Sequence, residues 1–144
     1  MKKVLFTVAL MFGAMVASAQ VSVVKEAKSM KKDPAAAAKV LEAALTNPET
    51  ANDPETWKLA GDLQKAIYDE ENMKMYLPGG QADMPKMYGA MLKMFEYYLK
   101  CDEVEQAGVA NGTVKKAKHR KKNAETLLSV RGNLANGGVE AFNV

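Results

Sequence analysis

The sequence predicts an all-α protein whose antiparallel helix pairs stack into a short array, an α-solenoid. Three observations predict this fold class. Apolar residues recur at three- and four-residue intervals, no segment shows the sustained alternation of a half-buried strand, and proline or glycine marks the ends of the periodic segments. The chain has 144 residues, of which 48% are hydrophobic and 26% charged, and this fits one globular domain. Short connections would make successive helices antiparallel.

Residues 1–19 have the pattern of a cleavable signal peptide. Lys2 and Lys3 precede a mainly apolar run over residues 4–16, and residues 17–19 are the small side chains that a signal peptidase requires. The run is shorter than the roughly 20 residues that cross a bilayer, so we do not expect a membrane-spanning mature protein. Gln20 stands where a lipoprotein would need cysteine. We therefore expect cleavage after Ala19 and a mature domain, residues 20–144, that is periplasmic or secreted.

Two helices are predicted in the first third of the mature chain. A short one covers residues 23–30 and ends at the basic segment that contains Pro34. Asp33 is suited to cap the next helix with Pro34 at its first position, because proline lacks the N–H that a first turn leaves unpaired. This alanine-rich helix should cover residues 35–45 and end at Asn47-Pro48. Its apolar stripe consists of Ala37, Val40, Leu41, Ala44 and Leu45.

Three further helices follow. Asp53-Pro54-Glu55 repeats the start signal and predicts a helix that runs to about Tyr76, where residues 77–80 interrupt it. A fourth helix should begin at Asp83 or Pro85 and end at about Cys101. Because residues 102–112 are polar and contain two glycines, we expect a loop there. Thr113 would then cap a fifth helix that passes through a basic stretch towards Leu134.

The segment from Trp57 to Gly61 resembles the opening of a tetratricopeptide repeat, in which a large residue, an apolar residue and a glycine follow the spacing W-x2-L-G. Gly61 would lie where two helices approach closely. Ala90 and Phe95 resemble the small and aromatic packing positions of the repeat. Residues 134–143 resemble the first helix of another repeat that stops before its second helix. The chain is thus similar to the amino-terminal part of an exported bacterial tetratricopeptide-repeat protein.

This resemblance implies a scaffold that binds a protein or peptide partner in the cell envelope through a concave surface, with no catalysis and no cofactor. Trp57, Tyr68 and Tyr97 are the expected aromatic anchors. The residues themselves agree with a non-enzyme. No serine of the mature chain lies in a G-x-S-x-G motif, no glycine-rich phosphate loop is present, and His119 has no candidate orienting group in the sequence.

A stripe of sulfur-containing residues on the fourth helix suggests an alternative function. Met84, Met87, Met91 and Met94 recur at three- and four-residue spacing, and Cys101 continues the stripe. Thioether and thiolate groups prefer Cu(I) over harder ions, so an exported protein could bind copper here. Methionine at this spacing is also a common filler of helix interfaces, and we favour this interpretation.

Six positive charges lie between residues 115 and 122. A polyanion, an anionic lipid head group or an acidic protein could bind them, or they could form a solvated helix face. Nucleic acid is not an expected partner, because the stretch contains no aromatic residue and removal of Lys2 and Lys3 leaves 18 basic against 17 acidic side chains. The six residues are Lys115, Lys116, Lys118, Arg120, Lys121 and Lys122.

Two smaller features complete the predictions. Cys101 is the only cysteine, so it is either buried or paired with a second chain. Its neighbour Lys100 is a reason to expect a lowered thiol pKa. The adjacent acids Asp69, Glu70 and Glu71 point to different faces of a helix, and we expect all three to be solvated.

Overall fold

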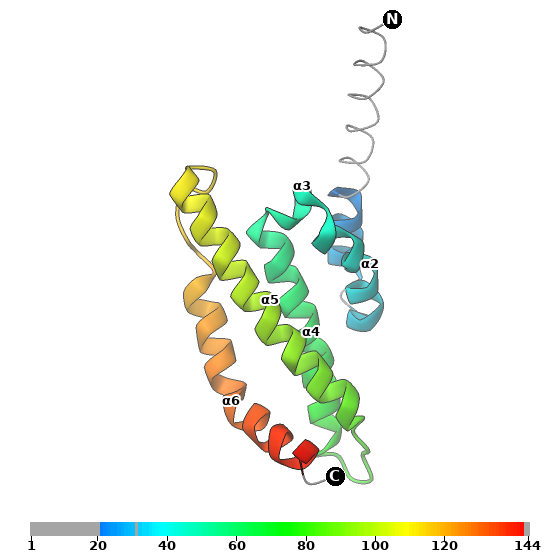
Figure 1. Ribbon diagram of the computed structural model, residues 1–144. Coiled ribbons are helices and arrows are strands. Elements are labelled where there is room, and N and C mark those ends of the chain that lie inside the picture. Colours follow the sequence, from blue (N-terminus) through cyan, green and yellow to red (C-terminus); the bar gives the residue numbers. More distant parts are fainter. Residues whose placement is uncertain (1–20, 31, 143–144) are drawn as a thin grey trace, which may run out of the picture.

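The computed structural model describes residues 21–30 and 32–142, and within these ranges the chain forms helices joined by turns, with no strand (Figure 1). The all-α prediction is therefore confirmed. The predicted signal peptide lies outside the described residues. None of the helices in the described part of the chain combines the length and the apolar character needed to cross a membrane.

The helices form a sequential array. Residues 21–29 are helical, and the longer elements α2, α4, α5 and α6 follow, with α2 packed on α4, α4 on α5 and α5 on α6. Successive long helices run in opposite directions, and α6 lies on the side of α5 away from α2 (Figure 1). The bounds are α2 Pro34–Thr46, α3 Pro48–Ala51, α4 Pro54–Lys74, α5 Met84–Asn111 and α6 Arg120–Phe142.

Four of these helices begin in the same way. An aspartate or asparagine side chain accepts a hydrogen bond from a backbone N–H of the first turn, and a proline occupies one of the first two helical positions. The starts predicted for α2, α4 and α5 are present. The short helix α3 was not predicted, because Asn47-Pro48 ends α2 and also begins a new turn. The four caps are Asp33, Asn47, Asp53 and Asp83.

Two clusters of buried side chains hold the array together. One lies between α4, α5 and α6, and the other between residues 21–29, α2 and α4. Truncating a fully buried leucine such as Leu41 to alanine would cost roughly 2–5 kcal/mol. The first cluster contains Ile67, Tyr68, Met87, Ala90, Met91, Met94, Tyr98 and Val130. The second contains Ala27, Ala37, Leu41, Ala44, Ala60 and Leu63.

Helices α4 and α5 approach closely at a glycine. A Cβ atom added at Gly61 would lie 2.3 Å from two ring carbons of Tyr98, so only glycine fits this position without displacing the ring. The Tyr98 hydroxyl donates a hydrogen bond of 2.7 Å to Asp62 Oδ1, which fixes the ring across the contact. The close approach expected at Gly61 is therefore present.

The predicted loop over residues 102–112 is wrong, because α5 continues as helix to Asn111. Its two glycines have different roles. Gly108 is buried inside the helix, where an added Cβ would lie 2.5 Å from the Val114 side chain. Gly112 has φ +80°, a conformation that side chains disfavour, and it ends the helix. The chain then folds back, with Val114 N donating to Gly108 O at 2.9 Å.

The predicted start of the last helix is also wrong. Thr113 does not cap it, since α6 begins at Arg120 and residues 112–119 form a non-helical connection. The physical reason lies in α5. The buried Glu105 carboxylate accepts hydrogen bonds from the backbone N–H groups of Lys118 and His119, at 2.9 and 3.1 Å. It satisfies donors that precede α6, as a capping side chain would, so the helix starts beside it.

Candidate binding groove

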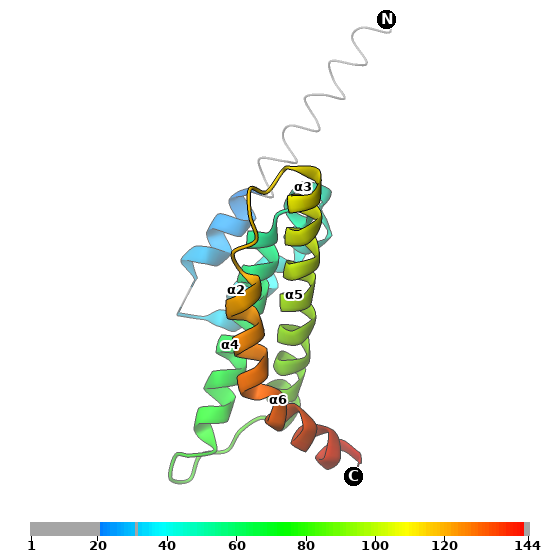
Figure 2. The same ribbon diagram turned by 90° about the vertical axis from the view of Figure 1, so that its left-hand side faces the viewer.

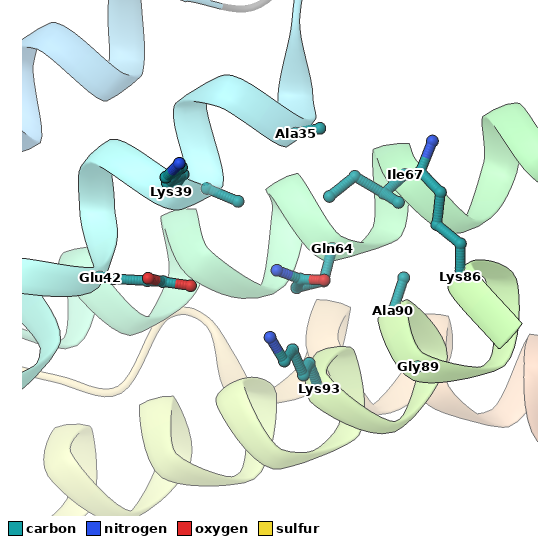
Figure 3. Close-up of a pocket in the computed structure, with 10 residues that line it drawn as sticks. Ala35, Lys39, Glu42, Gln64, Ile67, Lys86, Gly89, Ala90 and Lys93 are labelled. Atoms are coloured by element: carbon teal, nitrogen blue, oxygen red, sulfur yellow. The ribbon is translucent and has the colours of Figure 1, made fainter.

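A groove of about 440 Å³ lies over α4, between α2 and α5 (Figure 3). Its volume falls within the range of ligand sites in proteins. Each of the three helices contributes side chains to it. Helix α2 contributes Ala35, Ala38, Lys39 and Glu42, α4 contributes Gln64 and Ile67, and α5 contributes Lys86, Gly89, Ala90 and Lys93.

Small apolar residues leave this space unfilled. Ala38 and Ala90 lie at the facing sides of α2 and α5, and neither side chain extends beyond Cβ. A Cβ atom added at Gly89 would have no atom within 4 Å, so the space beside this residue is open. The alanine-rich sequence of α2 thus has two consequences, since it favours the helix and leaves a hollow between that helix and α5.

Gln64 presents an unused amide to the groove. Its side chain is 8% exposed and forms no hydrogen bond within the described part of the chain. The amide oxygen and nitrogen of Gln64 stay accessible to solvent through the groove, so they can accept a partner there without first being freed from the core. Gln64 and Lys93 extend into the groove from α4 and α5 (Figure 3). The amide therefore offers both a donor and an acceptor to a bound molecule.

The lining carries more positive than negative charge, with Glu42 as its carboxylate and three lysines around it. Lys86 is engaged elsewhere, since its Nζ lies 2.7 Å from Glu71 Oε1. Within the described residues, Lys39 and Lys93 form no ion pair. These two exposed ammonium groups flank the groove from α2 and α5 and remain available to an anionic partner.

Glu71 holds Lys86, a residue at one end of the groove. The expectation that Glu71 is solvated is wrong. Its carboxylate is 1% exposed and accepts hydrogen bonds from Lys74 Nζ, Lys86 Nζ and the backbone N–H of Asp83, at 2.7, 2.7 and 3.1 Å. Hydrogen bonds from Lys74 and Lys86 lower the pKa of Glu71 to about 2. The network links the end of α4 to the start of α5, the helix that carries four of the lining residues.

The predicted aromatic anchors do not form one surface. Trp57 and Tyr97 are in contact, with ring centroids 5.8 Å apart, and the Trp57 indole donates a hydrogen bond of 2.7 Å to Ala51 O. Trp57 lines a second hollow of about 800 Å³ between α3 and the end of α5. The anchor role of Tyr68 is corrected, because the residue is 3% exposed and its hydroxyl accepts a hydrogen bond from Asn133 of α6.

Intramolecular ion pairs divide the basic stretch. Lys118 pairs with Glu55, Arg120 with Asp102 and Lys121 with Glu125. Within the described chain Lys115, Lys116 and Lys122 have no ion pair. The pairs of Lys118 and Arg120 therefore link the region where α6 begins to α4 and α5. The three unpaired lysines remain available to an external partner.

His119 does have a neighbouring carboxylate, contrary to the expectation from the sequence. Its Nε2 atom lies 3.0 Å from Glu55 Oε1. The ion pair with Lys118 is the largest cause that lowers the pKa of Glu55, and His119 adds to it. The pair joins the start of α4 to the connection that precedes α6.

The methionine stripe lies in the core. Met87, Met91 and Met94 are buried between α4, α5 and α6, and Met84 packs against the same cluster while partly exposed. The placement agrees with the packing interpretation, and copper binding stays a prediction. Among the described residues, no three His, Cys, Asp or Glu side chains are grouped so that they could hold a metal ion.

Cys101 is buried, which was one of the two alternatives expected for it. Its thiol donates a hydrogen bond of 3.3 Å to Pro54 O. The expectation of a lowered pKa is wrong. Burial raises the pKa of the Cys101 thiol to about 11, although the neighbouring Asn123 amide opposes the shift. A thiol that is buried and protonated at neutral pH is a poor nucleophile.

Comparison with protein-family models, curated proteins and solved structures finds no match to this chain. The tetratricopeptide resemblance therefore stays a prediction. The groove residues Lys39, Gln64 and Lys93 were not among the predicted site residues. One signal could have pointed to Gln64, which is an amide on a helix face whose neighbours at Ala60 and Ile67 are apolar.

Proposed function

We propose that this protein is an exported helical scaffold that binds a protein or peptide partner in the groove over α4 and performs no chemistry of its own. The observation that carries the proposal is the Gln64 side chain, which is 8% exposed and presents an amide without a hydrogen-bond partner to the unfilled groove. A bound peptide would complete this hydrogen bonding and cover the methyl groups of Ala38 and Ala90.

The placement of the reactive side chains supports binding rather than catalysis. The Cys101 thiol is buried with a raised pKa, and His119 is engaged with Glu55 at the start of α4. Neither residue lines the groove. A nucleophile and its base must lie within hydrogen-bonding reach of each other and of a bound substrate, and these two side chains lack such a site.

Cross-linked capture from the envelope fraction tests the proposal. Tagged mature protein is compared with a Gly89→Leu variant, whose new side chain enters the groove, and with Gly132→Leu on α6 as a matched control. An added Cβ has no atom within 4 Å at either glycine, and both substitutions favour the helix, so the variants should fold.

We expect a partner that the wild-type protein and the Gly132→Leu variant both retain and that the Gly89→Leu variant loses. The purified partner should show the same loss in a binding titration. A partner retained by all three proteins, or no reproducible partner, would contradict groove binding. A parallel variant changes Lys115, Lys116 and Lys122 to Gln. It tests whether these lysines, which form no ion pair within the described chain, contribute to the same interface.

A further inference from the structure

We infer that the groove over α4 holds an extended, acidic peptide segment, with its backbone hydrogen-bonded to Gln64 and its carboxylates beside Lys39 and Lys93. This inference rests on the proposed function and adds the chemical class of the ligand. Three features of the groove carry it: the unpaired amide, the charge of the walls and the small residues of the lining.

The Gln64 amide matches a peptide backbone. A glutamine side chain presents a carbonyl and an NH₂ group in one plane, as a peptide group presents C=O and N–H. Both groups of Gln64 lack a hydrogen bond within the described chain and are accessible from the groove, although the residue as a whole is only 8% exposed. An extended segment leaves its own N–H and C=O groups free to bond sideways, whereas a helix uses most of them internally.

The charges of the walls favour an anion. Lys39 lies on α2 and Lys93 on α5, and within the described residues neither forms an ion pair. Glu42 is the carboxylate of the lining, and the third lysine, Lys86, already pairs with Glu71. In an extended segment, carboxylates on adjacent residues would point to opposite sides and bring charge to both walls, while a basic segment would meet two unpaired ammonium groups.

The small residues of the lining, rather than the volume of the groove, favour an extended chain over a docked helix. One helical turn with its side chains is 10–12 Å wide and 5.4 Å long, so it occupies roughly 400–600 Å³. The groove offers about 440 Å³, which is space for about one turn. An extended backbone is narrower, and the small side chains of Ala35, Ala38 and Gly89 allow it to approach the helices closely.

Selection from a displayed library of random peptides tests the inference. Each peptide is joined to its display protein at both ends, so a free terminal carboxylate plays no part. The mature protein is the bait. The library is first depleted on the Gly89→Leu variant, which takes out peptides that bind outside the groove. We expect the enriched peptides to be rich in aspartate and glutamate and to bind more weakly at high salt.

Variants of the groove then locate the contacts on one selected peptide. Lys39→Gln with Lys93→Gln should weaken binding at least tenfold, and Gln64→Leu, which keeps the side-chain volume, should do the same. Lys25→Gln with Lys28→Gln is the matched control, because both lysines are exposed on helical residues 21–29 and lie outside the groove. In the ¹⁵N-labelled protein, the Gln64 side-chain amide resonances should shift when the peptide binds.

Several results would overturn the inference. These are enrichment of neutral or basic peptides, no enrichment over the Gly89→Leu variant, unchanged binding by the double lysine variant or by Gln64→Leu, and unshifted Gln64 amide resonances. The outcome is separable from that of the proposed function. If a partner captured from the envelope depends on Gly89 but no acidic peptide is selected, the ligand class is wrong and groove binding stands. If neither experiment gives a groove-dependent ligand, both fail.

Discussion

At the scale of single residues, Glu71 shows how one buried carboxylate fixes the connection between two helices. Its three hydrogen-bond donors come from α4, from α5 and from the residue that caps α5. Two other acidic residues, Asp69 and Glu70, directly precede Glu71 in the sequence and are solvated. Nothing in the sequence shows which of the three carboxylates is buried. The distinction arises only when residues 75–83 turn back and place Asp83 and Lys86 beside Glu71.

The lowered pKa of Glu71 predicts a dependence of stability on pH. Because its pKa is about 2 in the folded protein against an ordinary 4.5, the ionised carboxylate stabilises the fold above about pH 4.5. This contribution is lost as the pH falls from about 4.5 to about 2. Urea unfolding of the wild-type protein and Glu71→Gln should therefore differ most at neutral pH and converge in acid. A difference that stays constant over this range, or an equal effect of Glu70→Gln, would contradict the assignment.

Gly61 makes the second prediction at this scale. Gly61→Ala should destabilise the protein by about 1–3 kcal/mol, because the new Cβ would lie 2.3 Å from the Tyr98 ring. Helix propensity alone predicts the opposite sign. Gly132→Ala is the matched control and should stabilise by up to about 1 kcal/mol, since nothing lies within 4 Å of its Cβ. Denaturant unfolding measures both, and equal effects would show that the Tyr98 contact is unimportant.

The methionines of α5 give the third prediction. If they serve as packing residues, Met84→Leu with Met91→Leu should change the free energy of unfolding by less than about 3 kcal/mol in total, because each swap nearly conserves volume. Neither the wild-type protein nor the variant should withdraw Cu(I) from a chromogenic chelator. Stoichiometric withdrawal by the wild-type protein that the double variant loses would favour the copper-binding function instead.

At the scale of the elements, the sequence predicts helix starts better than helix ends. Asp33, Asp53 and Asp83 are each followed by proline within two residues, and this local signal suffices because a cap and its proline act within one turn. The end of α5 lacks such a local signal. Gly108 lies inside the helix because Val114 packs against it, and Gly112 ends the helix because it adopts a positive φ. Two glycines four residues apart look alike in the sequence.

The groove was less predictable than the helices for a related reason. The periodicity of α2, α4 and α5 identifies the apolar face of each helix, but the groove depends on how far apart α2 and α5 lie on α4. That distance follows from tertiary packing of the alanine-rich face of α2. Gln64 is an amide on an apolar face, and only the structure shows whether it is paired in the core or open to a ligand.

Glu105 supplies the prediction at the scale of elements. Removing its carboxylate by Glu105→Ala should leave the backbone N–H groups of Lys118 and His119 unpaired and destabilise the protein by about 1–3 kcal/mol. Hydrogen exchange should accelerate at these two amides and in the first turn of α6. Glu103→Ala, an exposed position on the same helix, should change neither quantity. Unchanged exchange at residues 118 and 119 would show that Glu105 does not set the start of α6.

At the scale of the whole molecule, the groove and α6 lie on different sides of α5, and Figure 2 shows α6 crossing the array as its last layer. Helix α6 has a thin buried seam. Among its side chains up to residue 137, Asn123, Val130 and Gly137 are buried at intervals of seven residues, while most others are exposed. Helices α4 and α5 contribute far more of the core. We therefore expect the groove to keep its structure and its affinity for a ligand when α6 is loosened.

This independence gives the last prediction. An added Cβ at Gly137 would lie 2.3 Å from the Tyr88 ring, so Gly137→Ala should loosen α6 where it packs on α5. Local opening exposes the least buried elements first, and hydrogen exchange should accelerate in α6 while α2 and α4 stay protected. The selected peptide should bind this variant as it binds the wild-type protein, because the groove is formed by α2, α4 and α5. If loosening α6 weakened peptide binding, α6 would have to support the groove through α5, and the two sides of the array would act as one cooperative unit.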